Sequence, residues 1–215
     1  MSEQPRARVV VLAGPSGSGK SRLAERLGLP VLRLDDFYKD GDDPTLPWMD
    51  LGLGSHGGER VVDWDDPASW HADEAVATLV ALCRDGSADV PTYELAANGR
   101  TGHHRLDLGA SAYVIAEGIF AQHVVAACRE AGILADAVCV RQHRVVTFWR
   151  RLRRDLAERR KPPWILVRRG LLLMRLQSFV VDDATARGCA PVTPEQAYAR
   201  LRPLVASGAA VDHGG

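Results

Sequence analysis

Eight consecutive residues carry the strongest chemical signal in this sequence of 215 residues. Gly14 to Ser21 read GPSGSGKS, a complete Gly-x-x-x-x-Gly-Lys-Ser pattern between an apolar run and a helical pattern. Glycines in such a loop let backbone N–H groups turn inward, where they and the helix N-terminus surround phosphate oxygens. We therefore expect a nucleotide here, held by Gly14, Ser16, Gly17, Ser18, Gly19, Lys20 and Ser21, with Lys20 on the β- and γ-phosphates and the Ser21 hydroxyl on Mg²⁺.

Three acids stand where parallel strands are expected to end. Asp35 and Asp36 follow the apolar run PVLRL, and Glu117 closes AYVIAEG. Open α/β sheets bind ligands at this edge, so Asp35 is the candidate base for an acceptor hydroxyl and Glu117 a candidate Mg²⁺ ligand opposite Ser21. Structural roles stay open for all three, because Asp35 or Asp36 could cap a helix and Glu117 could be a buried structural glutamate.

Proteins with such a phosphate loop catalyse several reactions, and the rest of the chain narrows the choice. No Asn-Lys-x-Asp guanine-reading motif is present, and 215 residues form one compact domain, which is short for a motor ATPase. A small kinase remains. Positioning and proton removal are most of what a protein contributes to phosphoryl transfer, which fits an acid at Asp35.

Positive charge gathers between His143 and Lys161 in an otherwise balanced chain. An apolar seam at Phe148, Leu152 and Leu156 predicts a helix whose arginines face elsewhere. We expect a helical lid over about residues 143–165 that neutralises phosphate charge, with a solvated, ion-paired helix face as the alternative. The candidate lid residues are Arg151, Arg154, Arg159 and Lys161.

The elements that must position these residues alternate along the chain. Apolar runs predict strands at 8–13, 30–34, 112–118 and 133–140, separated by helical patterns, which favours an α/β fold with a central parallel sheet covered by helices on both faces. Between the second and third of these strands we expect an acceptor-side region over about 39–108. It contains a long acidic loop from 39 to 60, a helix from Asp66-Pro67 to about Arg84, and a small β-hairpin with a type I′ turn at Asn98-Gly99. A last helix is expected from Pro194.

Several motifs in this order resemble the uridine kinase (uridine-cytidine kinase) family. They are GPSGSGKS, DDFYKD, VDWDDPASW, VPTYEL, VIAEGIF and RRLRRDLAER, which together run from about residue 9 to 161. The resemblance implies a P-loop NTPase fold and an ATP-dependent kinase acting on the 5′-hydroxyl of a nucleoside. It implies Asp35 as the catalytic acid, with Lys20 and Arg154 acting on the phosphates, Arg159 and Lys161 on ATP, and Arg151 near the acceptor. It also implies Asp65 on the ribose hydroxyls and Trp64 beside the base, in a pocket with Tyr38, Tyr93 and Asn98.

The base-reading hairpin departs from the family pattern. Leu95 stands where the family has an aromatic residue, and Asn98 stands where it has a histidine. Asn98 can still donate or accept a hydrogen bond, but Asn-Gly is also a strong turn signal. Two alternatives to a nucleoside acceptor therefore stay open: another small-molecule alcohol such as pantothenate or a sugar phosphate, and a nucleotide-binding regulator without turnover.

The amino-acid composition narrows the classes of molecule that this protein could bind. Formal net charge is zero, which argues against general binding to nucleic acid. Four scattered cysteines and the lack of a long apolar run favour a reduced, cytoplasmic protein that does not enter a membrane. The expected partners are a small-molecule substrate, ATP and Mg²⁺, and a homo-oligomer is left open.

Overall fold

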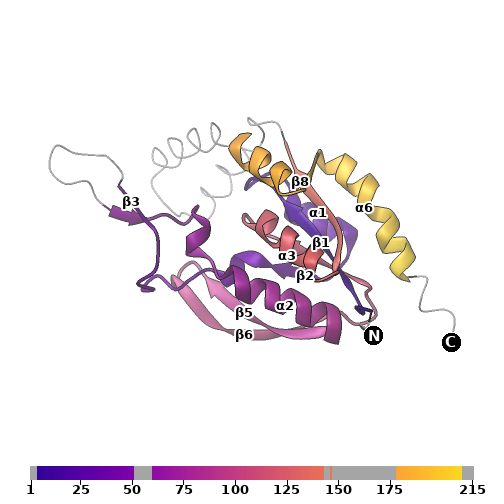
Figure 1. Cartoon of the computed structure of the whole chain (residues 1–215), viewed down its shortest axis with the longest axis horizontal. Coiled ribbons are helices and arrows are strands. Elements are labelled where there is room, and N and C mark those ends of the chain that lie inside the picture. Colours follow the sequence, from indigo (N-terminus) through magenta and orange to yellow (C-terminus); the bar gives the residue numbers. More distant parts are fainter. Residues whose placement is uncertain (1–3, 51–59, 143–145, 147–177, 210–215) are drawn as a thin grey trace.

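The computed structural model describes residues 4–50, 60–142, 146 and 178–209 (Figure 1). Its centre is a five-stranded sheet in the order β2-β7-β1-β8-β9, and every neighbouring pair in it is parallel. The strands are β1 (Arg8–Ala13), β2 (Val31–Arg33), β7 (Tyr113–Glu117), β8 (Leu134–Val140) and β9 (Ala190–Val192). The predicted parallel α/β sheet is confirmed. All the strands end at one edge, where the chemistry was expected.

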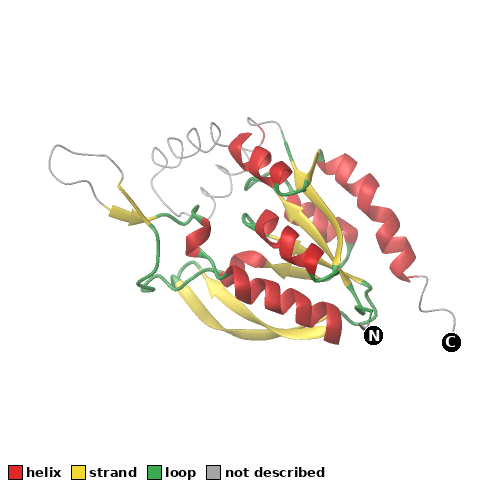
Figure 2. Ribbon diagram, in the orientation of Figure 1, coloured by secondary structure: helices red, strands yellow, loops and turns green. Residues whose placement is uncertain are grey.

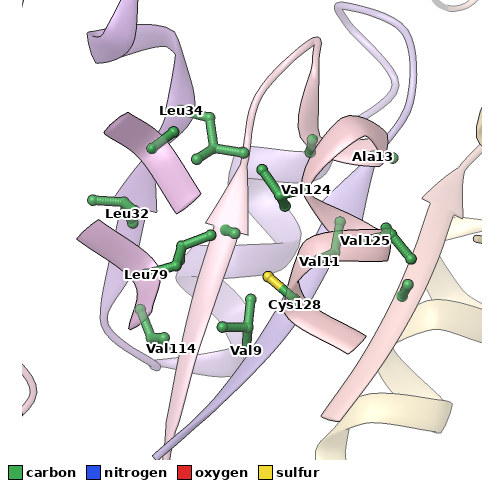
Figure 3. Close-up of a cluster of buried hydrophobic side chains, with 14 of the residues drawn as sticks. Val9, Val11, Ala13, Leu32, Leu34, Leu79, Val114, Val124, Val125 and Cys128 are labelled. Carbon is green, nitrogen blue, oxygen red and sulfur yellow. The ribbon is translucent and has the colours of Figure 1, made fainter. Parts of the chain in front are cut away.

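Alternate residues of β1 supply the two faces of the core. Val10 and Leu12 pack on one face with α1 (Lys20–Leu27) and α6 (Pro194–Ala209). Val9 and Val11 pack on the other face with α2 (Ala72–Asp85) and α3 (Val125–Glu130), as Figure 3 shows for Val9, Val11, Val125 and Cys128. Both faces of a parallel strand must be covered, so β1 is apolar almost throughout. Figure 2 shows helices on both sides of the sheet.

The acceptor-side region consists of short elements attached to this sheet. A 3₁₀ turn, η1 (Leu34–Phe37), follows β2, and a second one, η2 (Pro67–Ser69), precedes α2. Two antiparallel pairs complete the region, β3 (Trp48–Asp50) with β4 (Arg60–Val62) and β5 (Ser87–Glu94) with β6 (Gly99–Asp107). In Figure 1, β5 and β6 run along α2, whereas β3 lies away from the sheet.

Three sequence-based boundaries in this region are wrong. The helix expected from Asp66-Pro67 is interrupted after η2, because Trp70 is extended and His71 also lies outside the helical region before α2 begins. The expected structureless loop at 39–60 contains the strand β3 and ends in β4. The hairpin turn is not a two-residue type I′ turn, because Glu94 pairs with Gly99 and four residues lie between them; of these only Asn98 has a positive φ, at 50°.

Other expectations are confirmed. β1 has the predicted bounds, α2 ends at Asp85 with Gly86 as its left-handed C-cap, and α6 begins at Pro194.

All four cysteines are buried free thiols. The predicted lid over 143–165 lies outside the described residues apart from Val146. Within the described part of the chain, no helix has the length and apolar character that crossing a membrane requires.

Candidate active site

The phosphate loop lies between the end of β1 and the start of α1, at the centre of the sheet. Gly14 has φ 132°, and a Cβ at this position would collide with the carbonyl oxygen of Val140 in the β8 backbone. Gly17 and Gly19 also have positive φ, at 82° and 103°, and Gly19 is the N-cap of α1. No described side-chain hydrogen bond caps this helix, and a helix N-terminus of this kind favours an anion.

The serines within the loop differ in burial. Ser16 is half-buried and Ser18 is fully buried. The Ser18 N–H donates to the Pro15 carbonyl oxygen at 3.1 Å, so it stabilises the loop itself. The loop therefore has the strand–turn–helix setting that the sequence predicts. The Ser18 N–H, however, is already bonded within the loop.

Lys20 lies against the inner side of this loop. Its side chain is buried, and Nζ donates to the carbonyl oxygens of Gly14 at 2.6 Å and Pro15 at 3.3 Å. A buried ammonium needs such acceptors to offset the loss of water. The Lys20 ammonium is thus held beside the loop. Phosphate oxygens of a bound nucleotide would take the place of these carbonyl oxygens as its hydrogen-bond acceptors.

Ser21 and Glu117 meet across the carboxyl ends of β1 and β7. The Ser21 hydroxyl lies 3.2 Å from both carboxylate oxygens of Glu117 and donates to them. Burial raises the pKa of Glu117, while the nearby Lys20 charge and the Ser21 hydroxyl oppose that rise. Hydroxyl and carboxylate oxygens are ligands that Mg²⁺ accepts, so the pair fits a cation shared with bound phosphates.

Asp35 lies in η1, just beyond the end of β2, and not on the strand itself. Its Oδ1 accepts the Ile119 N–H at 3.1 Å, in the loop that follows Glu117. A Cβ at Gly118 would lie 2.8 Å from the same oxygen, so glycine permits this approach. The carboxylate is partly exposed and raises the pKa of Glu117 through like-charge repulsion. Asp35 therefore faces the same edge of the sheet as the Ser21–Glu117 pair.

An aromatic cluster lines the acceptor side next to Asp35. The Tyr38 ring lies 5.7 Å from Trp64, 5.8 Å from Tyr93 and 5.8 Å from Phe120, measured between ring centroids. The Tyr38 hydroxyl donates to the Trp64 carbonyl oxygen at 3.0 Å. Sequence reasoning named the first three of these residues and missed Phe120, although its position three residues after Glu117 in the EGIF motif was a signal.

Asp65 and Asp66 have separate roles at η2. Asp66 is the N-cap and accepts the Ala68 N–H at 2.8 Å. Asp65 is exposed, and its backbone N–H donates to Asp63 at 3.1 Å. The carboxylate predicted for ribose hydroxyls is therefore the solvent-facing one of the two, next to Trp64 in the aromatic cluster.

Asn98 lies at the tip of the β5–β6 hairpin. Its φ of 50° places it in the left-handed region, its carbonyl oxygen accepts the Gly41 N–H at 2.8 Å, and its side-chain amide packs directly over Gly41. These contacts give Asn98 a turn and packing role. The other candidates, Arg151, Arg154, Arg159 and Lys161, lie outside the described residues.

A pocket of about 470 Å³ opens beside the phosphate loop, and sequence reasoning did not identify it. It lies between α1, the residues just after β8 and the start of α6. Its lining residues are Gly19, Arg22, Leu23, Glu25, Arg26, Gln142, Pro194 and Glu195. A nucleotide with its phosphates on the loop has room here for its remaining parts.

Comparisons with known proteins give partial matches. No protein-family model matches the chain. A uridine kinase from Schizosaccharomyces pombe is 31% identical over 123 residues, covering 54% of this chain and 25% of that protein. Inorganic pyrophosphatase TTM1 from Arabidopsis thaliana is 31% identical over 121 residues, covering 53% of this chain and 16% of that protein. The chain thus matches a quarter or less of the length of these relatives.

A solved structure supports the fold over nearly the whole chain. It comes from Silicibacter sp. TM1040, carries the name "putative fructose transport system kinase", and is 18% identical with a TM-score of 0.57. The match covers 90% of this chain and 91% of that one. The sequence match and the fold together confirm what the motifs indicated: the chain is similar to uridine kinases and has the α/β fold of P-loop kinases.

Proposed function

We propose that this chain is an ATP-dependent kinase that transfers the γ-phosphate to the 5′-hydroxyl of a nucleoside, with uridine and cytidine as the first acceptors to test. One observation carries the proposal. The phosphate loop with Lys20, the Ser21–Glu117 pair and Asp35 converge at one edge of the sheet, although they come from three separate segments. This is the set of groups that phosphoryl transfer requires.

Each group has a chemical task in this proposal. The loop N–H groups and the start of α1 bind the phosphates, and Lys20 stabilises negative charge as it moves toward the leaving oxygen. Asp35 accepts the proton of the acceptor hydroxyl, and its bond to the Ile119 N–H fixes the direction of its carboxylate. Arg154, Arg159 and Lys161 would add positive charge from the lid, with Arg151 nearer the acceptor.

Ser21 and Glu117 would hold Mg²⁺, which neutralises charge on the β- and γ-phosphates when bound. The 3.2 Å contacts between the hydroxyl and the carboxylate show that their oxygens already lie close together.

The acceptor would bind against the partly exposed rings of Tyr38, Trp64 and Tyr93, while the buried Phe120 packs on Tyr38 from the core. Flat aromatic faces suit a planar base, and the exposed Asp65 carboxylate can accept two sugar hydroxyls. The pocket beside Gly19 would take the adenosine part of ATP. In this proposal residues 1–215 form one kinase domain, which acts in the cytoplasm on small molecules.

A second candidate keeps the phosphoryl transfer and changes the acceptor to another small-molecule alcohol. The position of Asn98 favours it, because its side chain packs on Gly41 at the hairpin tip and is occupied there. Leu95 is exposed in the same turn, so both residues that depart from the family pattern lie at the hairpin tip.

One screen separates these candidates. Purified protein with Mg²⁺ and ATP is offered uridine, cytidine, a purine nucleoside, pantothenate and several sugar phosphates, while ADP release is followed by a coupled assay. We expect acceptor-dependent ADP release that is fastest with a pyrimidine nucleoside. Turnover only with another alcohol would establish the second candidate.

The controls address the remaining outcomes. Because some relatives carry the name inorganic pyrophosphatase, pyrophosphate is tested without an acceptor, and hydrolysis there would contradict the kinase proposal. Tight ATP binding with no turnover on any acceptor would indicate a regulator. The Lys20→Ala variant should be inactive in every arm.

A further inference from the structure

Asp36 is a buried acid for which the proposed reaction has no use. The residue is 6% exposed, beside the partly exposed Asp35 in the same 3₁₀ turn. Burying a carboxylate is unfavourable unless hydrogen bonds or charges compensate for the lost water. Its partners therefore indicate what the residue does.

One partner is a backbone donor on the edge of the β5–β6 hairpin. Asp36 Oδ1 accepts the Tyr93 N–H at 3.4 Å, a long hydrogen bond. In a two-stranded antiparallel sheet, alternate N–H groups of each strand point away from the partner strand. The Tyr93 N–H is on this outer edge of β5, which faces η1, and Asp36 satisfies it.

The hairpin is irregular at the same level. Thr92 pairs with Gly102 and Tyr93 with Arg100, so Thr101 is an extra residue in β6. Such a bulge increases local twist and changes the direction of nearby side chains. The Tyr93 ring lies 5.8 Å from the Tyr38 ring, and Tyr38 follows directly after η1. The Asp36 contact thus connects the two segments that carry these rings.

Charges around Asp36 are consistent with this contact. Arg33 Nε lies 4.0 Å from Oδ2, but its side chain is 67% exposed and its pull is screened by solvent. Burial raises the pKa of Asp36, with Asp35 adding to the rise and Arg33, the Tyr93 N–H and His104 opposing it. The hydrogen bond to Tyr93 is accordingly the most specific contact of the carboxyl group.

We propose that Asp36 is a positioning residue for the acceptor site, which holds Tyr93 of the hairpin against the turn that carries Asp35, and so fixes the wall formed by Tyr38 and Tyr93. The proposal rests on the proposed function in that it places the acceptor against this wall. The position of the hairpin can be measured without any activity.

The first experiment measures amide hydrogen exchange by NMR in wild type, Asp36→Ala and Asp36→Asn. Loss of the acceptor in Asp36→Ala should speed exchange of the Tyr93 amide about tenfold or more, whereas Asn keeps a side-chain oxygen and should restore most of the protection. Asp40→Ala is the matched control, because Asp40 accepts the neighbouring Arg100 N–H at 2.7 Å. It should expose Arg100 and leave Tyr93 protected.

The second experiment uses the acceptor identified by the screen. Asp36→Ala should raise KM for the acceptor about tenfold, with kcat within about threefold of wild type and KM for ATP unchanged, and Asp36→Asn should recover most of the loss. If Asp36→Ala does not fold, Asp36→Ser replaces it, since the shorter side chain does not reach the Tyr93 N–H.

Two results would overturn the proposal. Unchanged Tyr93 exchange in a folded Asp36→Ala protein would show that the contact does not hold the hairpin. A fall of about 100-fold in kcat with unchanged KM would make Asp36 a catalytic residue. If no acceptor is found, the proposed function fails, but the exchange experiment still decides the role of Asp36.

Discussion

The phosphate side and the acceptor side of this site are built differently. On the phosphate side, one unbroken segment from Gly14 to Ser21 supplies most of the groups, and it is fixed between a central strand and a helix. On the acceptor side, Tyr38, Trp64, Tyr93 and Phe120 come from four segments joined by short turns and hairpins. The first arrangement is set by local backbone geometry, whereas the second depends on long-range packing. Changes on the phosphate side should therefore affect the chemical step, and changes on the acceptor side should mainly affect selectivity and binding.

Lys20→Ala should have the largest effect. Removal of the buried ammonium takes away the charge that stabilises the transferring phosphoryl group, so turnover should fall to the background rate, a loss of about 10³-fold or more. The measurement is kcat in the coupled assay at saturating ATP. Lys20→Arg is the charge-matched control and should also be poor, because the larger head group does not fit against Gly14 and Pro15. Near-normal rates in Lys20→Ala would contradict the kinase proposal.

Asp35→Asn should come next. Loss of the base should lower kcat by about 10²- to 10⁴-fold while ATP binding, measured by calorimetry, stays close to wild type. Asp36→Asn is the adjacent control and should change kcat far less. The reverse behaviour of the two variants would mean that the acids have been assigned to the wrong roles.

Asp65→Ala tests whether the acceptor is a sugar. If ribose hydroxyls bind this exposed carboxylate, kcat/KM for the nucleoside should fall. The fall should correspond to a loss of about 1 to 3 kcal/mol of transition-state stabilisation, and KM for ATP should not change. Asp63→Ala is the matched control, since the carboxylate of that neighbouring acid accepts the Asp65 backbone N–H. Equal kcat/KM in wild type and Asp65→Ala would remove the ribose role.

Asn98→His distinguishes a turn residue from a base-reading residue. Given its φ of 50° and its packing over Gly41, we expect a loss of about 1 kcal/mol in unfolding free energy and no change in the ranking of uridine, cytidine and a purine nucleoside. Denaturant unfolding and competition assays measure the two effects. A changed ranking would show that the hairpin tip reaches the base.

The smallest effect should be the pH dependence of Asp36. Because the pKa of this carboxyl group is raised on folding, mainly by burial, its stabilising contribution is present below its ordinary pKa and is lost as pH rises through the raised one. The unfolding free energy of wild type minus that of Asp36→Asn should therefore fall as pH increases from about 4 and then level off. Denaturant titrations between pH 4 and 8 measure it. A difference that grows with pH would mean that the native environment favours the ionised form.

Much of the phosphate side could be predicted from the sequence because its signals are local. The glycine spacing, the lysine and serine that follow, and the apolar run before them specify a strand, a loop and a helix within 20 residues. Glu117 was found in the same way, from its position at the end of an apolar run. Its contact with Ser21 also follows, because parallel neighbours β1 and β7 end at the same edge.

The acceptor side could be predicted only in part. The tyrosines and Trp64 were named from motifs, but Phe120 and the position of Asn98 were not foreseen. Asn-Gly favours a tight turn locally, yet the pairing of Glu94 with Gly99 fixes a four-residue connection and places Asn98 on Gly41. Contacts between residues so far apart in the chain have no local sequence signal.

The sequence by itself determined the α/β class, the phosphate loop and the acids at the ends of the strands, because strand and helix periodicities and glycine conformations depend on near neighbours. The tertiary structure decided which of two adjacent aspartates is exposed at the site and which is buried against the hairpin. Asp35 and Asp36 are equivalent in type, and they differ because Ile119 offers its N–H group to Asp35 whereas Tyr93 of the hairpin offers its N–H group to Asp36. That choice depends on packing between segments 57 to 84 residues apart, which no local pattern encodes.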